Sequence, residues 1–219
     1  MTQPNELKQL RQQIRQQRRL LSAEVQQQHA QQALYHLKSY LNHYLETPHT
    51  QASQLNQPLN IALFLAQDGE LDTQVSIDYL WQSNRFRVFL PVLETKPNWH
   101  MGFAQYQTNS TMINNRFQIA EPEMPLEQHL EGQQIDIVLM PLVGFDSDGN
   151  RLGMGGGYYD RTFEFKRTQP STQTEQTKQT LLIGWAHSCQ QVDQLAAQPW
   201  DVPLDGIITE QGFTSFTSQ

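Results

Sequence analysis

The sequence contains almost no cysteine: Cys189 is the only one in 219 residues. A single thiol cannot form an internal disulfide, so the class of small secreted proteins stapled by disulfides is excluded. The N-terminus also lacks the basic start and apolar run of a secretory signal. We therefore expect a cytoplasmic protein whose one thiol is buried and inert.

Long hydrophobic runs are also missing. The longest, residues 135–143, includes a charge and a proline and is well short of the ~18 apolar residues of a membrane span. Acidic residues exceed basic ones by 22 to 15, which gives a formal net charge of −7. This balance argues against a large nucleic-acid footprint, but a nucleotide needs only a few local cations. We expect a monomer that binds small molecules, with no nucleic acid and no membrane as partner.

The length of 219 residues suits a single domain that buries roughly 70% of its unfolded surface. We predict one domain over residues 1–219 that begins with a helical segment at residues 1–45. Apolar residues recur there at helical spacing, and Ser22 marks a break between two helices. A solvated face is the ordinary explanation for the basic residues that crowd the first helix. These residues are Lys8, Arg11, Arg15, Arg18 and Arg19.

Beyond residue 60, short apolar runs alternate with a helical pattern at residues 75–81. The predicted strands cover residues 61–65, 87–90, 102–106, 135–140, 181–186 and 206–209. Pro91 is expected to end the second strand. The fold class is therefore α/β, with an open, mostly parallel sheet flanked by helices in three layers, as in Rossmann-like folds. Ligands of such sheets gather at the carboxyl ends of the strands. Residues 166–180, rich in Gln and Thr, predict a mobile surface loop.

The most informative segment of the sequence is rich in glycine. Four glycines stand within five residues: Gly153, Gly155, Gly156 and Gly157. Backbone amides without a neighbouring Cβ can converge on phosphate oxygens. The segment is not a Walker A loop, because no Gly-Lys-Ser/Thr follows, and Tyr158 replaces the third glycine of the dinucleotide fingerprint. The alternative is a flexible turn between a strand and a helix. A cation and a carboxylate for Mg²⁺ nearby, Arg151 and Asp160, favour a nucleoside triphosphate.

Several short motifs follow one another along this chain. Gly-Phe-Asp at residues 144–146, Gly-Asn-Arg-Leu-Gly at 149–153 and Gly-Gly-Gly-Tyr-Tyr-Asp-Arg at 155–161 form the central part. Weaker matches flank it: the basic N-terminal helix, residues 64–73, 89–92, 121–122, Gly-Trp-Ala-His at 184–187, Gln190 and residues 200–205. Together they resemble the 5-formyltetrahydrofolate cyclo-ligase family over nearly the whole chain.

This resemblance implies an enzyme that converts 5-formyltetrahydrofolate and ATP, with Mg²⁺, into 5,10-methenyltetrahydrofolate, ADP and phosphate. It assigns Arg151 and Asp160 to catalysis, and Asp160 and Asp201 to the metal. The implied ATP-binding residues are Lys8, Arg11, Arg151, Leu152, Gly153, Met154, Gly155, Gly156, Gly157, Tyr158 and Tyr159. The implied folate-binding residues are Glu70, Met154, Gly155, Gly156, Gly157 and Tyr158. Leu7 occupies the place of a family lysine, and Lys8 or Arg15 is the candidate substitute.

The residues alone leave alternatives open. Glu70 follows Asp-Gly and can be ordinary turn polarity, Asp201 can cap a turn, and the adjacent tyrosines can be core aromatics. His187 receives no catalytic role. Two other functions compete with the ligase: a non-catalytic folate or nucleotide binder, and another ATP-dependent small-molecule kinase on the same scaffold.

Overall fold

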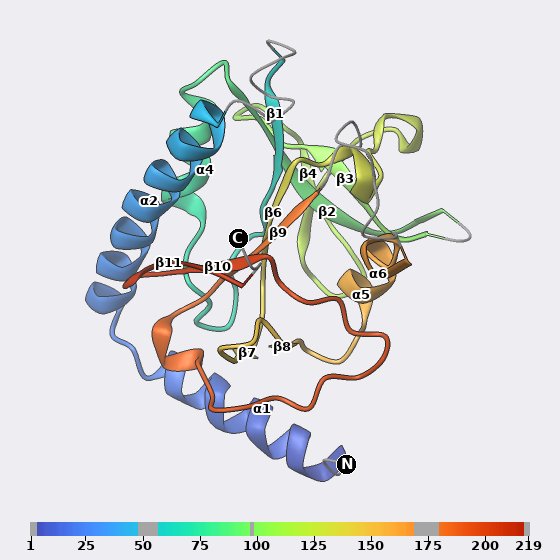
Figure 1. Cartoon of the computed structure of the whole chain (residues 1–219). Helices are drawn as coiled ribbons and strands as arrows, with labels where there is room; N and C mark the ends of the chain where they lie inside the picture. Colours follow the sequence, from blue (N-terminus) through green and yellow to red (C-terminus); the bar gives the residue numbers. More distant parts are fainter. Residues whose placement is uncertain (1–3, 48–56, 97–98, 169–179, 217–219) are drawn as a thin grey trace.

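The computed structural model describes residues 4–47, 57–96, 99–168 and 180–216 (Figure 1). In these residues, a seven-stranded sheet has the order β11-β10-β9-β6-β1-β2-β3. Its strands are β1 (Leu59–Ala62), β2 (Phe86–Lys96), β3 (Trp99–Gln105), β6 (Ile137–Met140), β9 (Leu181–Trp185), β10 (Gly206–Thr209) and β11 (Gly212–Ser215). The five inner strands run parallel to one another, and the edge strands β3 and β11 pair antiparallel with β2 and β10. The mostly parallel α/β sheet predicted from the sequence is confirmed.

Helices cover both faces of this sheet, so the predicted three layers are present. The helices are α1 (Pro4–Arg19), α2 (Ala23–Glu46), α4 (Gln74–Trp81), α5 (Tyr158–Thr162) and α6 (Phe165–Thr168). Figure 1 shows α2 and α4 on one side of the sheet and α5 with α6 on the other. None of the described helices combines the length and the apolar character that crossing a membrane requires.

The central strands have hydrophobic side chains on both faces, which explains why they read as continuous apolar runs. In β6, Ile137 and Leu139 pack into the core beneath α2 and α4. Val138 and Met140 point to the opposite core, which includes Phe163 just after α5. Successive side chains of a strand alternate between faces, so one four-residue strand supports both layers.

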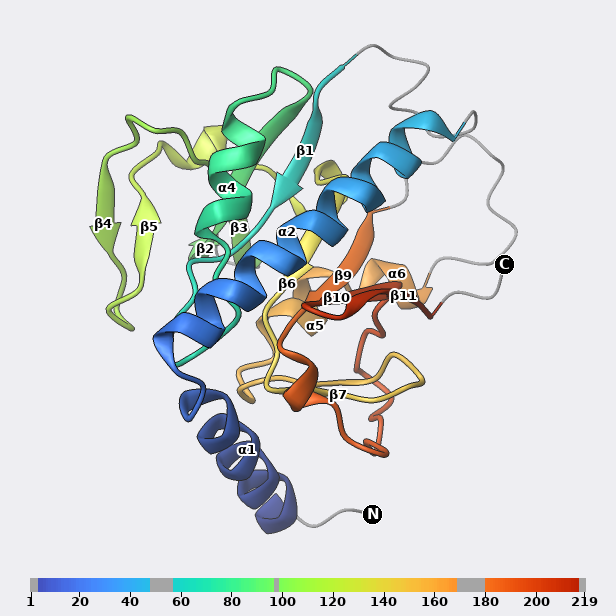
Figure 2. The same ribbon diagram turned by 90° about the vertical axis from the view of Figure 1, so that its left-hand side faces the viewer.

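The N-terminal segment consists of two helices and not one long helix. Ser22 caps α2, its hydroxyl accepting a hydrogen bond from the Val25 amide at 3.2 Å, as the predicted break requires. The buried face of α2 repeats at helical spacing through Ala30, Ala33, Leu34, Leu37 and Leu41. Figure 2 shows α2 lying across the sheet while α1 turns away beyond its end.

Pro91 does not end its strand, contrary to the prediction. β2 continues to Lys96 and places Pro91 opposite Phe103 of β3. Phe103 exchanges both backbone hydrogen bonds with Leu130 on its other side, so this β2–β3 pair requires no donor from the proline. β1 ends opposite Phe89, two residues earlier. Pro91 therefore lies where the missing N–H leaves no gap in the ladder.

Short elements complete the chain and differ in part from the predictions. Two hairpins, β4 (Met112–Asn114) with β5 (Ala120–Pro122) and β7 (Gly144–Phe145) with β8 (Arg151–Leu152), were not predicted. The predicted loop at residues 166–180 begins inside α6, where Lys166 donates to Asp205 at 2.7 Å and to the Thr180 carbonyl at 2.6 Å. Its remaining part, 169–179, lies outside the described residues.

Candidate active site

The loops that follow β1 and β6 meet where the strand order reverses. From β1 the chain moves to β2 on one side, and from β6 it moves to β9 on the other, while β1 and β6 are parallel neighbours. Such a switch point is where open α/β sheets bind ligands. The loop after β1 contains Glu70, and the segment after β6 contains the glycine loop. The topology thus brings the predicted folate and ATP residues to one edge of the sheet.

The glycine loop joins β8 to α5 and leaves backbone accessible. Met154, Gly155 and Gly156 are exposed. Gly155 and Gly157 have φ values of +95° and +63°, a region that glycine adopts without the penalty of a Cβ. The Gly156 carbonyl accepts a hydrogen bond from Arg161 at 2.9 Å. The loop is therefore a defined turn whose open backbone can face a ligand.

Arg11 reaches the glycine loop from α1. Its Nε donates to the Gly153 carbonyl at 2.8 Å, and a Cβ built on Gly155 would lie 3.8 Å from its guanidinium. Lys8 is exposed one turn earlier on α1, on the same face by helical spacing. Arg15 instead binds Asp68 at 2.6 Å. Of the two candidates to replace the family lysine, Lys8 is thus the one whose side chain is not engaged with Asp68.

Arg151 and Asp160 form an ion pair inside the site. Arg151 donates to Asp160 Oδ1, and their side chains are 5% and 18% exposed. The same oxygen accepts the Val202 amide at 3.2 Å, so Asp160 lies against the segment that contains Asp201. Arg151 Nε is buried without a hydrogen-bond partner among the described residues. The pair therefore holds a charged donor at the edge of the glycine loop.

Asp201 itself closes a turn. Its Oδ2 accepts the Gln198 amide at 2.8 Å, and its own amide donates to the Gln198 carbonyl at 3.0 Å. The turn-capping alternative is therefore present in the structure. It uses one carboxylate oxygen, and Val202 bridges this turn to Asp160. Both predicted metal residues thus lie in one neighbourhood, and their role as ligands stays a prediction.

Glu70 is also fixed by its own turn. Its Oε2 accepts the Gln67 amide at 3.0 Å, and Arg18 lies 3.6 Å from Oε1. Burial raises the pKa of Glu70 above its ordinary value, opposed by the Gln67 hydrogen bond and the Arg18 charge. Burial, and next the charge of Glu70, raises the pKa of Tyr159, while Arg151 opposes the rise. Tyr159 therefore links the Glu70 loop electrostatically to the Arg151 side of the site.

Tyr158 contacts a hairpin that the sequence analysis did not assign to the site. Its hydroxyl accepts a hydrogen bond from Arg116 at 3.1 Å, and Phe117 meets its ring edge to face at 6.4 Å between centroids. Phe117 remains 49% exposed and Met154 60% exposed. The tip between β4 and β5 thus places apolar surface next to the glycine loop. The mixed polar and apolar sequence of this hairpin gave no signal for the arrangement.

Arg18 is a second residue whose position was not predicted, and it is 1% exposed. It donates to the Asp68 carbonyl at 2.9 Å, to Asp68 Oδ2 at 3.0 Å and to the Leu142 carbonyl at 3.2 Å. Arg19 also pairs with the Asp68 carboxylate. A sequence signal existed, because Arg18 stands four residues after buried Ile14 on the apolar face of its helix.

Two further observations define the limits of the site. Cys189 is exposed, which corrects the prediction of a buried thiol. Burial of part of its surface and the charge of Glu210 raise its pKa. The thiol is therefore not an activated nucleophile.

A cavity of about 240 Å³ lies at the side of the sheet between Trp81 and Tyr106. Its lining includes none of the predicted site residues, so it is separate from this site.

These features define an α/β protein with an open glycine loop at its switch point. The sequence model of the 5-formyltetrahydrofolate cyclo-ligase family matches residues 3–210. A 5-formyltetrahydrofolate cyclo-ligase of Escherichia coli K12 is 39% identical over 199 residues, which cover 90% of this chain and 96% of that protein. This chain belongs to the 5-formyltetrahydrofolate cyclo-ligase family and is an enzyme of that class.

Solved structures show the same fold. A 5,10-methenyltetrahydrofolate synthetase from Mycoplasma pneumoniae is 30% identical with a TM-score of 0.64, over 94% of this chain and 99% of that one. The 5,10-methenyltetrahydrofolate synthetase of Aquifex aeolicus superposes with a TM-score of 0.71 at 22% identity, over 97% of this chain and 94% of that one. The second likeness supports the fold alone.

Proposed function

We propose that this enzyme converts 5-formyltetrahydrofolate and ATP, in the presence of Mg²⁺, into 5,10-methenyltetrahydrofolate, ADP and phosphate. Family membership supports the cyclo-ligase reaction. One observation supports the dependence on ATP: Arg11 from α1 meets the glycine loop at Gly153, beside the Arg151–Asp160 pair. Cations and open backbone amides around one turn are what a triphosphate requires.

The proposed chemistry follows from the substrate. An N-formyl group is an amide, whose oxygen is a weak nucleophile and a poor leaving group. Transfer of the γ-phosphoryl group to that oxygen releases ADP and makes the carbon electrophilic. The N10 amine then attacks this carbon, the C–O bond breaks, and phosphate leaves as N10 loses its proton. The protein must position the reactants and balance charge, and no covalent nucleophile is needed.

The cationic residues divide between two sides of the proposed ATP site. Arg11 and Lys8 lie on one face of α1, and Arg151 lies across the loop at the start of β8. The backbone from Arg151 to Tyr159 joins the two sides. We assign these cations to the triphosphate, where charge-assisted hydrogen bonds strengthen as charge shifts to the leaving ADP.

The residues present fit a magnesium ion. Asp160 uses Oδ1 for both Arg151 and Val202, and Asp201 uses Oδ2 for Gln198, so each carboxylate has a second oxygen. Mg²⁺ prefers oxygen ligands and is usually held by one or two carboxylates together with substrate phosphates. Asp160 and Asp201 would hold the ion, which would neutralise triphosphate charge during phosphoryl transfer.

We assign Glu70 and Tyr158 to the folate, together with the exposed loop residues from Met154 to Gly157. Glu70 is oriented by Gln67 and lies on the neighbouring loop of the switch point. Tyr158 presents an aromatic ring beside the tip of the β4–β5 hairpin. Such a ring can pack against a pterin.

The direct test mixes the purified protein with 5-formyltetrahydrofolate, ATP and Mg²⁺ and follows the methenyl chromophore in the near ultraviolet. We expect product only when all three are present, with one ADP released for each methenyl group formed. Tight binding without product would identify a non-catalytic binder. ADP release stimulated by another acceptor but not by the folate would identify a small-molecule kinase.

Asp160→Asn is the sharpest variant for the ATP and metal assignment. It keeps an oxygen that can accept from Arg151 but removes the carboxylate charge. We expect turnover to fall by about 10²-fold or more, with unfolding in urea little changed. Wild-type turnover in this variant would remove Asp160 from the proposed mechanism. Asp148→Asn, in an exposed turn, is the matched control.

The single-domain organisation over residues 1–219, the monomeric state and the cytoplasmic location remain predictions. The two cores on opposite faces of one sheet support a single folding unit.

A further inference from the structure

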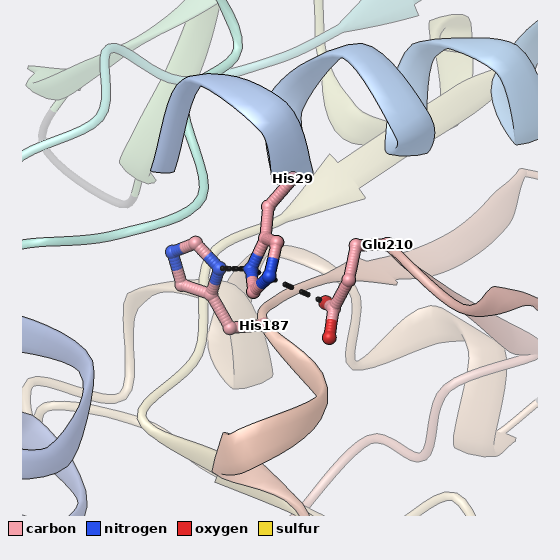
Figure 3. Close-up of side chains that lie close together, drawn as sticks. All are labelled: His29, His187 and Glu210. Atoms are coloured by element: carbon pink, nitrogen blue, oxygen red, sulfur yellow. Dashed lines mark hydrogen bonds and ion pairs between the residues drawn. The ribbon is translucent and has the colours of Figure 1, made fainter. Parts of the chain in front are cut away.

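Three side chains with metal-ligating atoms converge at the carboxyl ends of β9 and β10 (Figure 3). His29 comes from α2, His187 follows β9, and Glu210 follows β10. Their ligating atoms all lie within 4.8 Å of one another. None of these residues belongs to the ATP or folate site proposed above, so the cluster needs its own explanation.

The distances are close to those of a transition-metal site. The Nδ1 atoms of His29 and His187 are 2.9 Å apart, and His29 Nδ1 lies 3.8 Å from Glu210 Oε2. A tetrahedral zinc ion with bonds of about 2.0–2.1 Å holds its ligand atoms roughly 3.3 Å apart. One distance is slightly short and the other slightly long. The third pair of ligand atoms lies within 4.8 Å, so side-chain rotations are required to place all three around one ion.

The surroundings hold the ligands in place. His187 is 0% exposed, and the side chains of Glu210 and His29 are 7% and 20% exposed. The Ser188 amide donates to Glu210 Oε2 at 2.9 Å, and its hydroxyl donates to Oε1. Such outer hydrogen bonds orient ligands in metal sites. The partly exposed His29 leaves a route from solvent.

The protonation states also suit a metal. Burial, followed by the nearby His29, lowers the pKa of His187 to about 4, so its ring is neutral at pH 7. Burial alone would raise the pKa of Glu210, but the hydrogen bonds from Ser188 hold it below its ordinary value. Metal ligation requires neutral imidazole and charged carboxylate. A metal ion would take the place of the hydrogen bond between the two Nδ1 atoms.

We propose that His29, His187 and Glu210 form a binding site for one divalent transition-metal ion of the zinc type. Two imidazoles and a carboxylate suit Zn²⁺ or Co²⁺, whereas Mg²⁺ takes oxygen ligands. The ion is therefore different from the one assigned to Asp160 and Asp201. Bound, it joins α2 to the ends of β9 and β10 and restrains the helix against the sheet.

The experiment titrates tag-free full-length protein with Co²⁺ and follows its visible absorption, then displaces Co²⁺ with Zn²⁺ to obtain the affinity. We expect one tightly bound ion, a tetrahedral cobalt spectrum and a melting temperature that rises with Zn²⁺. His29→Ala and Glu210→Gln should each weaken the affinity at least about tenfold and reduce the thermal shift at a given Zn²⁺ concentration. Their metal-free melting curves show that each variant is folded.

Two control variants exclude adventitious ligands. His43→Ala removes an exposed histidine of the same helix, and Cys189→Ser removes the exposed thiol nearby. Both should bind within about twofold of wild type. The proposal is overturned by no stoichiometric binding, or by equal affinity in His29→Ala and His43→Ala. Methenyl formation in Mg²⁺ is measured separately, so failure of this site leaves the ligase proposal standing.

Discussion

Both halves of α1 have basic side chains, but these side chains bind different partners. In its last turns, Arg15, Arg18 and Arg19 all bind Asp68 of the loop after β1. Three donors around one carboxylate anchor the helix to the fold. These arginines are therefore engaged with protein before any ligand arrives.

The first half of α1 is less engaged. The Nε of Arg11 donates a hydrogen bond to the Gly153 carbonyl, while Lys8 is exposed. In the proposed function, this half of the helix supplies cations for the triphosphate. Basic residues of one helix thus have different partners: Asp68 of the fold binds the three arginines of the second half, and the backbone of the glycine loop binds Arg11.

The largest expected effect is on stability, from Arg18→Met. Loss of the guanidinium leaves the Asp68 carbonyl without its Arg18 donor and removes one of the two donors of the buried Leu142 carbonyl, which keeps Gln190 Nε2. We expect a cost of about 3 kcal/mol of unfolding free energy. Urea denaturation measures it. Arg19→Met, at a side chain that is 54% exposed, should cost less than about 1 kcal/mol. Equal losses of unfolding free energy in the two variants would contradict the expectation that buried Arg18 stabilises the fold more than exposed Arg19.

The next effect is on ATP. Arg11→Ala should raise the KM for ATP about tenfold, because one charged hydrogen-bond donor is lost, while the midpoint of urea denaturation stays within error of wild type. Steady-state methenyl formation measures the KM. Arg15→Ala is the matched control and should leave the KM for ATP unchanged. If Arg15→Ala raised it as much as Arg11→Ala, the two halves of α1 would not be functionally distinct.

A variant at Glu70 tests the folate-binding role assigned to the loop after β1, which the arginines of α1 bind through Asp68. Glu70→Gln keeps the amide contact with Gln67 but removes the charge, so we expect the KM for the folate to rise about fivefold, in line with one charged contact, with the KM for ATP unchanged. Asp72→Asn, at an exposed carboxylate two residues on, should change neither. A parallel rise in both KM values for Glu70→Gln would contradict a folate-specific role.

The smallest effect is a pH dependence of the anchor. Burial alone would raise the pKa of Asp68, but hydrogen bonds from Arg15 and Arg19 lower it below the ordinary 3.8. The unfolded chain then takes up the proton first, so this stabilisation is full above pH 3.8 and fades as the pH falls through the lowered pKa. In urea unfolding, the gap between wild type and Asp68→Asn should close by about 1 kcal/mol or less from pH 6 to pH 3. A constant gap would contradict it.

Much of the sheet could be predicted because its inner strands are buried on both faces. An apolar run such as residues 137–140 directly predicts a buried strand. Strands that depend on a partner are harder to predict: β4 and β11 are short and largely exposed. Pro91 misled the prediction because its tolerance depends on Phe103 pairing with Leu130, a contact that no local pattern reveals.

The candidate site also has parts that the sequence indicates and parts that only the fold reveals. The glycine segment and Arg151 were predictable because their composition is unusual, and the structure brings Arg11 to that segment. The meeting of His29 with His187, 158 positions apart, follows only from the path of α2 across the sheet. Arg18 shows the intermediate case, since its helical position indicated burial but not the partner that makes burial possible.

Gly69 has a further consequence. A side chain there would come within 3.2 Å of the Arg18 carbonyl, so the Glu70 loop and the backbone of α1 touch without an intervening side chain, and Asp68 fastens the same contact. The loop that contains Glu70 and the helix that contains Arg11 are therefore joined backbone to backbone, and the position of either one is set by the other.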